Sequence, residues 1–131
     1  MEPYLDWKEI TITPSQLTGY TTAIPMLDTP AANQFYEVVK IMMKTPFNSV
    51  AYDYAGNIDF EINGERMMRF QYDTISSAFD TVSIGNAILC KDSCAPFLGL
   101  GYGLDLRLDS AAPTVGDSDV YIKVWYYLHE F

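Results

Sequence analysis

Positively charged residues are scarce in this sequence. Its 131 residues include 8 Lys and Arg against 17 Asp and Glu, which gives a formal net charge of −9. Because every phosphate contact needs a cation to neutralise it, this balance argues against DNA, RNA and anionic lipid surfaces as partners. The sequence has no run of about 18 apolar residues, so it predicts no membrane span. Residues 1–6 are acidic and lack an apolar segment, so no secretory signal is predicted.

Cysteine and histidine are also rare. Cys90 and Cys94 are separated by three residues, whereas redox pairs have two intervening residues. A structural zinc site needs four ligands, and these cysteines with the single His129 leave it one short. Because no secretory signal is predicted, we expect two free thiols. His129 lies at the end of a predicted strand, where a well-oriented catalytic histidine is unusual, so we interpret it as a surface or interface residue.

Carboxylates are so numerous that chance pairs are certain. Asp59 and Glu61 would share one strand face as a glycosidase pair does, but a solvated strand face explains them as well. Asp109, Asp117 and Asp119 fall in a predicted loop that would suit calcium, although the loop lacks the spacing of an EF-hand. We therefore predict no catalytic residue, no metal site and no cofactor, with calcium at this loop left as an open alternative.

Aromatic residues are abundant, and they point to a mainly β fold. The chain has 10 Tyr, 7 Phe and 2 Trp, while 7 Pro and 8 Gly divide it into short segments. Short segments of this composition favour an antiparallel β-sandwich, jelly-roll-like, over a helical bundle. No repeat or linker interrupts the sequence, so we expect an N-terminal arm at 1–9 and a single domain at 10–131.

The predicted elements follow from alternation and turn signals. Thr13 before Pro14 predicts one helical turn at 13–17, and a helical stripe (Ile75, Ala78, Phe79 and Val82) predicts a second short helix within 73–83. Asn63-Gly64 predicts a hairpin turn. The Gly99, Gly101 and Gly103 face of one strand predicts close approach by another backbone or ring. The strand candidates are 24–30 (extended), 35–44 (with Val39, Ile41 and Met43 on one face), 57–62, 67–72, 84–89, 98–108 and 120–128.

The last strand is apolar or aromatic on both of its faces. One face is assigned to the core: Val120, Ile122, Val124, Tyr126 and Leu128. A sandwich strand should show polar residues on its other face, yet here that face consists of Tyr121, Lys123, Trp125 and Tyr127, with the Lys123 stem expected to lie along the rings. Either the chain's own segments or another subunit must cover these rings. Because interfaces favour Tyr and Trp, we predict a subunit interface there.

Several short motifs resemble those of small virion proteins of tailed bacteriophages. They are an opening Ile-Thr-x-x-Gln-Leu turn within 10–17, an apolar-Pro stretch at 24–31, a strand at 36–43, a Tyr-containing loop at 52–54, and a closing aromatic strand at 120–127. The resemblance implies a β-sandwich or jelly-roll virion component, often a trimer, with no catalytic role.

These observations predict a non-enzymatic structural component of a virion, assembled in the host cytoplasm. A capsid decoration or head-fibre protein is the first expectation, forming a homotrimer and binding major capsid or tail proteins. A tail or baseplate component is the nearest alternative. A host-facing carbohydrate-binding module that uses Tyr52, Tyr54, Tyr102 and Trp125 is a second, and a small hydrolase with paired carboxylates is a third.

Overall fold

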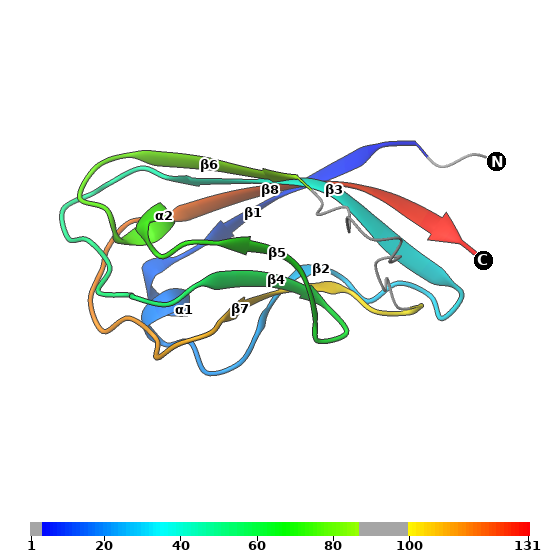
Figure 1. Ribbon diagram of the computed structural model, residues 1–131, viewed down its shortest axis with the longest axis horizontal. Helices are drawn as coiled ribbons and strands as arrows, with labels where there is room; N and C mark the ends of the chain where they lie inside the picture. The colour runs from blue at the N-terminus through cyan, green and yellow to red at the C-terminus, as the bar shows by residue number, and fades with distance from the viewer. Residues whose placement is uncertain (1–3, 87–99) are drawn as a thin grey trace, which may run out of the picture.

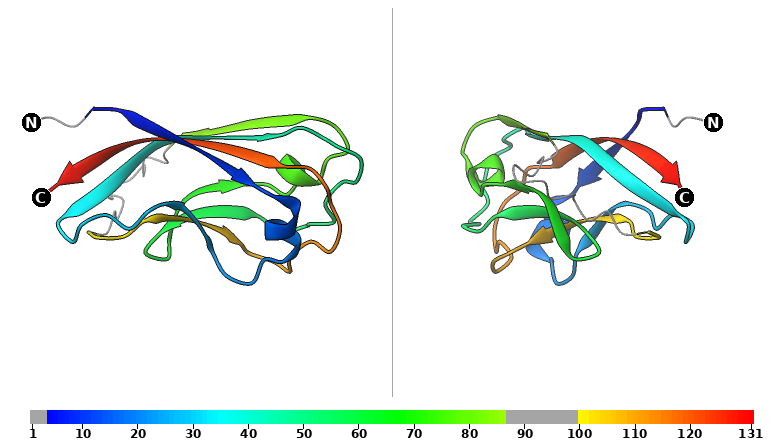
Figure 2. Two further views of the ribbon diagram at one scale, coloured as in Figure 1. Left: turned by 180° about the vertical axis from the view of Figure 1, so that it is seen from behind. Right: turned by 45° about the vertical axis from the view of Figure 1, so that its right-hand side comes forward.

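Two antiparallel four-stranded sheets face each other in the computed structural model, which describes residues 4–86 and 100–131 (Figures 1 and 2). The first sheet has the order β1-β8-β3-β6 and the second the order β2-β7-β4-β5. Two short helices complete the fold, so the predicted mainly-β sandwich is confirmed. The elements are β1 (Asp6–Ile12), α1 (Pro14–Thr18), β2 (Ile24–Leu27), β3 (Gln34–Thr45), β4 (Ile58–Ile62), β5 (Glu65–Phe70), α2 (Asp73–Ser76), β6 (Thr81–Asn86), β7 (Leu104–Leu108) and β8 (Val120–Glu130).

The core lies between the two sheets and is built from alternate residues of their strands. Phe60 is fully buried, and its ring meets that of Phe70 edge-on at 5.6 Å between centroids. The remaining buried side chains come from both layers in near-equal share. Those from the first sheet include Ile12, Ile41, Met43, Val120, Ile122 and Val124, and those from the second include Ile58, Ile62, Leu104, Leu106 and Leu108.

Two local predictions are confirmed in atomic detail. In the hairpin between β4 and β5, Asn63 and Gly64 have φ angles of 51° and 75°, the left-handed pair that a two-residue hairpin turn requires. At the start of α1, the Thr13 backbone N–H donates to Gln16 Oε1 at 2.8 Å, and the Thr13 hydroxyl accepts from the Gln16 backbone N–H at 3.4 Å. These reciprocal bonds form a capping box.

The N-terminal arm predicted at 1–9 is shorter than expected, because β1 begins at Asp6. Its residues pair with β8 from Asp6 opposite Tyr126 to Ile12 opposite Val120. The sequence of β1 gave little sign of this, since Asp6, Lys8 and Glu9 interrupt any apolar alternation. The long β8 provides the pairing partner, so β1 becomes an edge strand of the first sheet.

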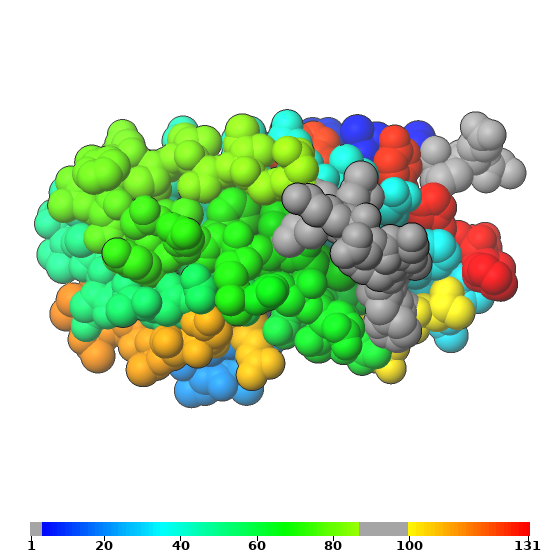
Figure 3. Space-filling model, in the orientation of Figure 1, coloured from blue at the N-terminus to red at the C-terminus, as the bar shows by residue number. Residues whose placement is uncertain are grey.

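The second predicted helix is also shorter than its apolar stripe suggested. α2 ends at Ser76, and Phe79 and Val82 are exposed rather than packed along a helix face. The chain instead continues as β6, which pairs with β3 along the upper margin of the molecule in Figures 1 and 3. Gly85 lets β6 pass close to β5, because a Cβ there would lie 2.4 Å from Met68 Sδ. Pairing with β3 therefore overrides the helical periodicity.

A bulge changes the predicted faces of β3. Its register with β8 shifts between Val38 and Lys40, which inverts the alternation along the strand. Tyr36 and Val38 consequently point into the core with Ile41 and Met43, whereas Val39, expected beside them, is only half-buried.

Residues 98 and 99 of the strand predicted at 98–108 lie outside the described residues, and the described part is a strand only from Leu104, where β7 begins. Gly101 has a φ of 78° and lies in a turn. The close approach predicted for this glycine face is confirmed at Gly103, where a Cβ would lie 2.3 Å from the Leu27 carbonyl oxygen. Cys90, Cys94 and the end of the strand predicted at 84–89 lie outside the described residues.

Candidate functional site

The outward side chains of β1, β8 and β3 in the first sheet form an aromatic, lysine-bearing surface, here called the outer face. Strand β8 runs through it between β1 and β3, so its outward residues Tyr121, Lys123 and Trp125 each have a neighbour on both sides. Trp125 lies opposite Trp7 and Lys40. In a second row, Tyr121 lies between Thr11 of β1 and Lys44 of β3. In a third row, Lys123 lies between Glu9 of β1 and Met42 of β3.

Tryptophan rings and lysine ammonium groups alternate across three strands of the outer face. Lys123 Nζ lies 4.3 Å from the ring centre of Trp7 and 4.9 Å from that of Trp125, while Lys40 Nζ lies 4.6 Å from the Trp125 ring. These are cation–π distances. We call these four residues the Trp–Lys row. Lys123 lies against the rings as expected, but Trp7 and Lys40 were missed, because only the strand register brings them to Trp125.

The aromatic side of β8 and its neighbour Trp7 are partly accessible to solvent. Tyr121 is 44% exposed and Trp7 is 53% exposed, whereas Trp125 and Tyr127 are half-buried. On the opposite side of β8, Val120, Ile122 and Val124 are buried as predicted, but Tyr126 is half-buried and Leu128 is exposed near the end of the strand. Within the described residues, the first sheet packs its inner side on the second sheet (Figure 2), so the outer face lies on the side away from the core.

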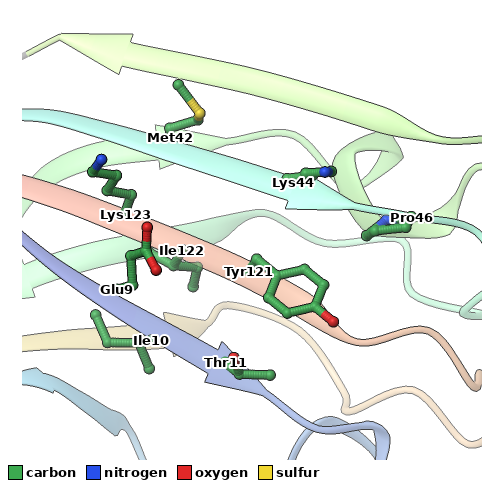
Figure 4. Close-up of a pocket in the computed structure, with 9 residues that line it drawn as sticks. All are labelled: Glu9, Ile10, Thr11, Met42, Lys44, Pro46, Tyr121, Ile122 and Lys123. Carbon is green, nitrogen blue, oxygen red and sulfur yellow. The ribbon is translucent and has the colours of Figure 1, made fainter.

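A shallow trough of about 450 Å³ crosses the outer face beside the Trp–Lys row (Figure 4). The Tyr121 ring lies across β8 within it, and the charged side chains of Glu9, Lys44 and Lys123 border it. The remaining lining residues are Ile10, Thr11, Met42, Pro46 and Ile122. The trough therefore combines one aromatic ring with two cations and one carboxylate.

The far end of the outer face holds His129. Its ring stacks on Phe35 at 4.9 Å between centroids, and its Nε2 lies 2.8 Å from Glu37 Oε1. The Tyr127 ring is 6.0 Å away. His129 is thus a half-buried residue at the end of the aromatic side of β8. This agrees with the predicted surface position.

The outer surface of the second sheet has a different chemistry. All three arginines of the chain lie there, on β5 and β7. Arg69 donates to both carboxylate oxygens of Asp59, at 2.7 and 3.0 Å, and Arg107 lies 3.7 Å from Glu61. Asp59 is buried, so the expectation of a solvated strand face is wrong for this residue. By contrast, three of the five lysines lie on the outer face of the first sheet.

Asp109 and Asp117, weighed above as calcium ligands with Asp119, are held by protein donors in two separate clusters. Asp109 accepts from the Asn57 backbone N–H at 2.6 Å and from Asn57 Nδ2 at 3.0 Å. Asp117 accepts from the Ser49 hydroxyl and from the Ser49 and Val50 backbone N–H groups. These bonds lower the pKa of both carboxyl groups. Within residues 4–86 and 100–131, no three acidic, His or Cys side chains are placed to share a metal ion.

Two tyrosines considered for sugar stacking lie in the interior. Tyr52 and Tyr54 are buried, and their hydroxyls donate to the carbonyl oxygens of Ser118 and Asn57, both at 2.5 Å. Burial raises the pKa of each to about 12. Their rings therefore cannot serve as an external platform for a sugar, which leaves only Tyr102 and Trp125 of that proposed set.

No protein-family model matches this chain, and no curated protein is significantly similar to it. Neither helix in the described part of the chain has the length and apolar character needed to cross a membrane.

Proposed function

We propose that this chain is a non-enzymatic structural component of a bacteriophage virion, a capsid decoration or head-fibre protein that assembles as a homotrimer. The observation that carries the proposal is the outer face. A three-stranded surface with Trp7, Trp125, Tyr121 and Tyr127 has the composition of a subunit interface, in which large rings supply contact area and lysine stems pack beside them.

The charge distribution favours a contact between unlike surfaces. Lys40, Lys44 and Lys123 gather on the outer face of a chain whose net charge is −9, so a like-to-like contact would bring lysines together. In a cyclic trimer each subunit uses two different surfaces, and the lysine-bearing face of one copy meets another part of its neighbour. The excess of carboxylates elsewhere on the chain makes that neighbouring surface acidic.

The resemblance of the short motifs to tailed-phage virion proteins supports the location of this assembly on a particle. The same surface would serve a tail or baseplate component equally well, since self-association and binding to other virion proteins are required in both places. The carbohydrate-binding alternative is weakened, because two of its four aromatic residues are buried.

Molecular mass measured by light scattering after size-exclusion chromatography tests the assembly. The proposal predicts three chains of 14.8 kDa, or a multiple of three, at micromolar concentration. A single 14.8 kDa species across the accessible concentrations would contradict it.

The particle location is tested by a reconstruction of the virion, which should place the outer face against another copy of the chain. Density that leaves this face open to solvent would contradict the assignment.

A further inference from the structure

Three of the four sheet edges carry features that discourage pairing with another chain. Strands β1 and β5 each contain three charged residues, and β2 has only four residues, one of which is Pro25. Charge, proline and short length are the means by which native sheets avoid edge-to-edge association, because an edge strand otherwise presents a row of unpaired backbone groups.

The fourth edge, β6, has none of these features. Its six residues, Thr-Val-Ser-Ile-Gly-Asn, include no charge and no proline, and no other described strand shares that property. β3 pairs with it on one side, and on the other side no strand of the described chain pairs with it. Val82 is 59% exposed and Ile84 is 56% exposed. An uncharged, β-branched edge of this kind is suited to accept an added strand.

We propose that β6 pairs antiparallel with β6 of a second copy of this chain about a two-fold axis, which joins the first sheets of both copies. An axis at Ser83 places Val82 of each copy opposite Ile84 of the other. Directly opposed residues of an antiparallel pair point to the same face, so both apolar pairs lie on the outward side. The backbone groups on both edges become hydrogen-bonded in the same step.

A second copy of β6 fits this edge better than the other strands of the chain do. Each of the other described strands would bring at least one charge or a proline to the contact. Self-pairing of β1 about Lys8 or Glu9 would place like charges opposite each other, which is destabilising. Self-pairing of β6 brings no charge at all, an advantage in a chain with a net charge of −9.

Sedimentation equilibrium over a concentration series tests the proposal with a doubly substituted protein. Val82→Lys with Ile84→Lys places a lysine opposite a lysine in both rows, and the exposure of both side chains allows the monomer to fold. We expect the two-fold association to weaken by about tenfold or more. The matched control is Val50→Lys with Val115→Lys, two valines on loops that are 45% and 49% exposed. Equal association of the two variants would overturn the proposal.

Hydrogen exchange at β6 provides a second, independent measurement. In the parent protein, the amides of 81–86 should exchange more slowly as the concentration rises, because pairing protects those directed away from β3. The Val82→Lys, Ile84→Lys variant should show no such dependence. Exchange at 81–86 that is independent of concentration in the parent would also overturn the proposal.

The edge contact does not rest on the proposed trimer, and the two have different stoichiometries. With the trimer intact, edge pairing converts three chains to six; in Trp125→Ala, where the outer face contact is weakened, it converts one chain to two. A parent protein that never exceeds three chains would refute the edge contact and leave the trimer. A Trp125→Ala variant that remains trimeric would refute the role of the outer face and leave the edge contact.

Discussion

Three aspartates join the loop at 46–57 to the loop at 109–119. Asp117 accepts from the first loop at Ser49 and Val50, and Asp109 accepts from Asn57. In the opposite direction, Asp53 accepts from the Thr114 hydroxyl and from the Thr114 and Val115 backbone N–H groups, the latter two at 2.7 and 3.0 Å. These carboxylates satisfy backbone donors that secondary structure leaves unpaired. The three aspartates of these loops thus hold the two loops together.

The Asp53 contacts predict a stability that depends on pH. The hydrogen bond from the Thr114 side chain, with those from the backbone, lowers the pKa of Asp53 to about 2. A lowered pKa contributes stability above the ordinary aspartate value of about 3.9, and that contribution is lost as the pH falls through the folded value. Asp53→Asn should therefore lower the urea midpoint at neutral pH, and its difference from the parent should vanish near pH 2. Glu65→Gln, on an exposed strand edge, is the control; a pH-independent difference for Asp53→Asn would contradict this explanation.

The buried Asp59 predicts a large difference between two neighbouring arginines. Arg69 makes a bidentate contact with Asp59, whereas Arg66 lies on the same strand with its side chain exposed. Arg69→Met leaves a buried carboxylate unpaired, so it should lower the melting temperature clearly more than Arg66→Met. Adding Asp59→Leu to Arg69→Met should restore part of the loss, since the pair is then replaced by apolar groups. Equal melting temperatures for the two single variants would show that the ion pair contributes little.

At the scale of elements, the sequence predicts what local signals determine. The Asn63-Gly64 turn, the Thr13 cap and the buried face of β8 as far as Val124 follow from residue types and periodicity, and the structure confirms these three predictions. The features that the sequence could not predict depend on strand register. The β3 bulge, the pairing of β1 with β8 and the extension of β6 beyond the helical stripe all require knowledge of which strands lie side by side.

The same limit applies to the candidate site. The Tyr121, Lys123, Trp125 and Tyr127 face could be predicted because β-strand side chains alternate. Trp7 and Lys40, which complete the Trp–Lys row, lie 118 and 85 positions from Trp125 in the sequence (125 − 7 and 125 − 40). Only the pairing of β1 and β3 with β8 brings them to its ring.

The β4–β5 hairpin offers a test of turn conformation separated from packing. Gly64 has a φ of 75°, and a Cβ placed there would have no neighbour within 4 Å. Gly64→Ala should therefore cost about 1 kcal/mol in free energy of unfolding, from left-handed backbone strain alone. Chemical denaturation measures this difference, with Asn63→Gly as a control that should cost little. A loss of several kcal/mol for Gly64→Ala would indicate a packing role for the turn.

The two faces of β8 predict different outcomes for neighbouring substitutions. Ile122 is almost fully buried between the sheets. Ile122→Ala should lower the free energy of unfolding by about 2–5 kcal/mol, because it removes buried carbon and leaves a cavity. Denaturant unfolding under conditions where the chain is monomeric measures this loss. A change below about 1 kcal/mol would mean that the core can close around the shorter side chain.

At the scale of the whole molecule, the two sheets present opposite kinds of surface. One is a network of arginines and carboxylates that pair within the chain, and the other gathers tryptophan, tyrosine and lysine on the three strands β1, β3 and β8. In a chain with a net charge of −9, three of the five lysines lie on one aromatic face, so this face differs in charge and composition from the opposite surface. A symmetric assembly requires the repeated use of one such face.

The measurement that tests the interface most directly is sedimentation equilibrium of Trp125→Ala beside its circular dichroism melt. Trp125 lies at the centre of the outer face, between Trp7 and Lys40. Central tryptophans contribute most to interface energy, so this substitution should weaken association by about 2 kcal/mol or more. It should also leave each chain folded, with a melt close to that of the parent at concentrations where both proteins are monomeric. A variant that assembles like the parent but melts far lower would contradict the interface, because the ring would then belong to the stability of the single chain.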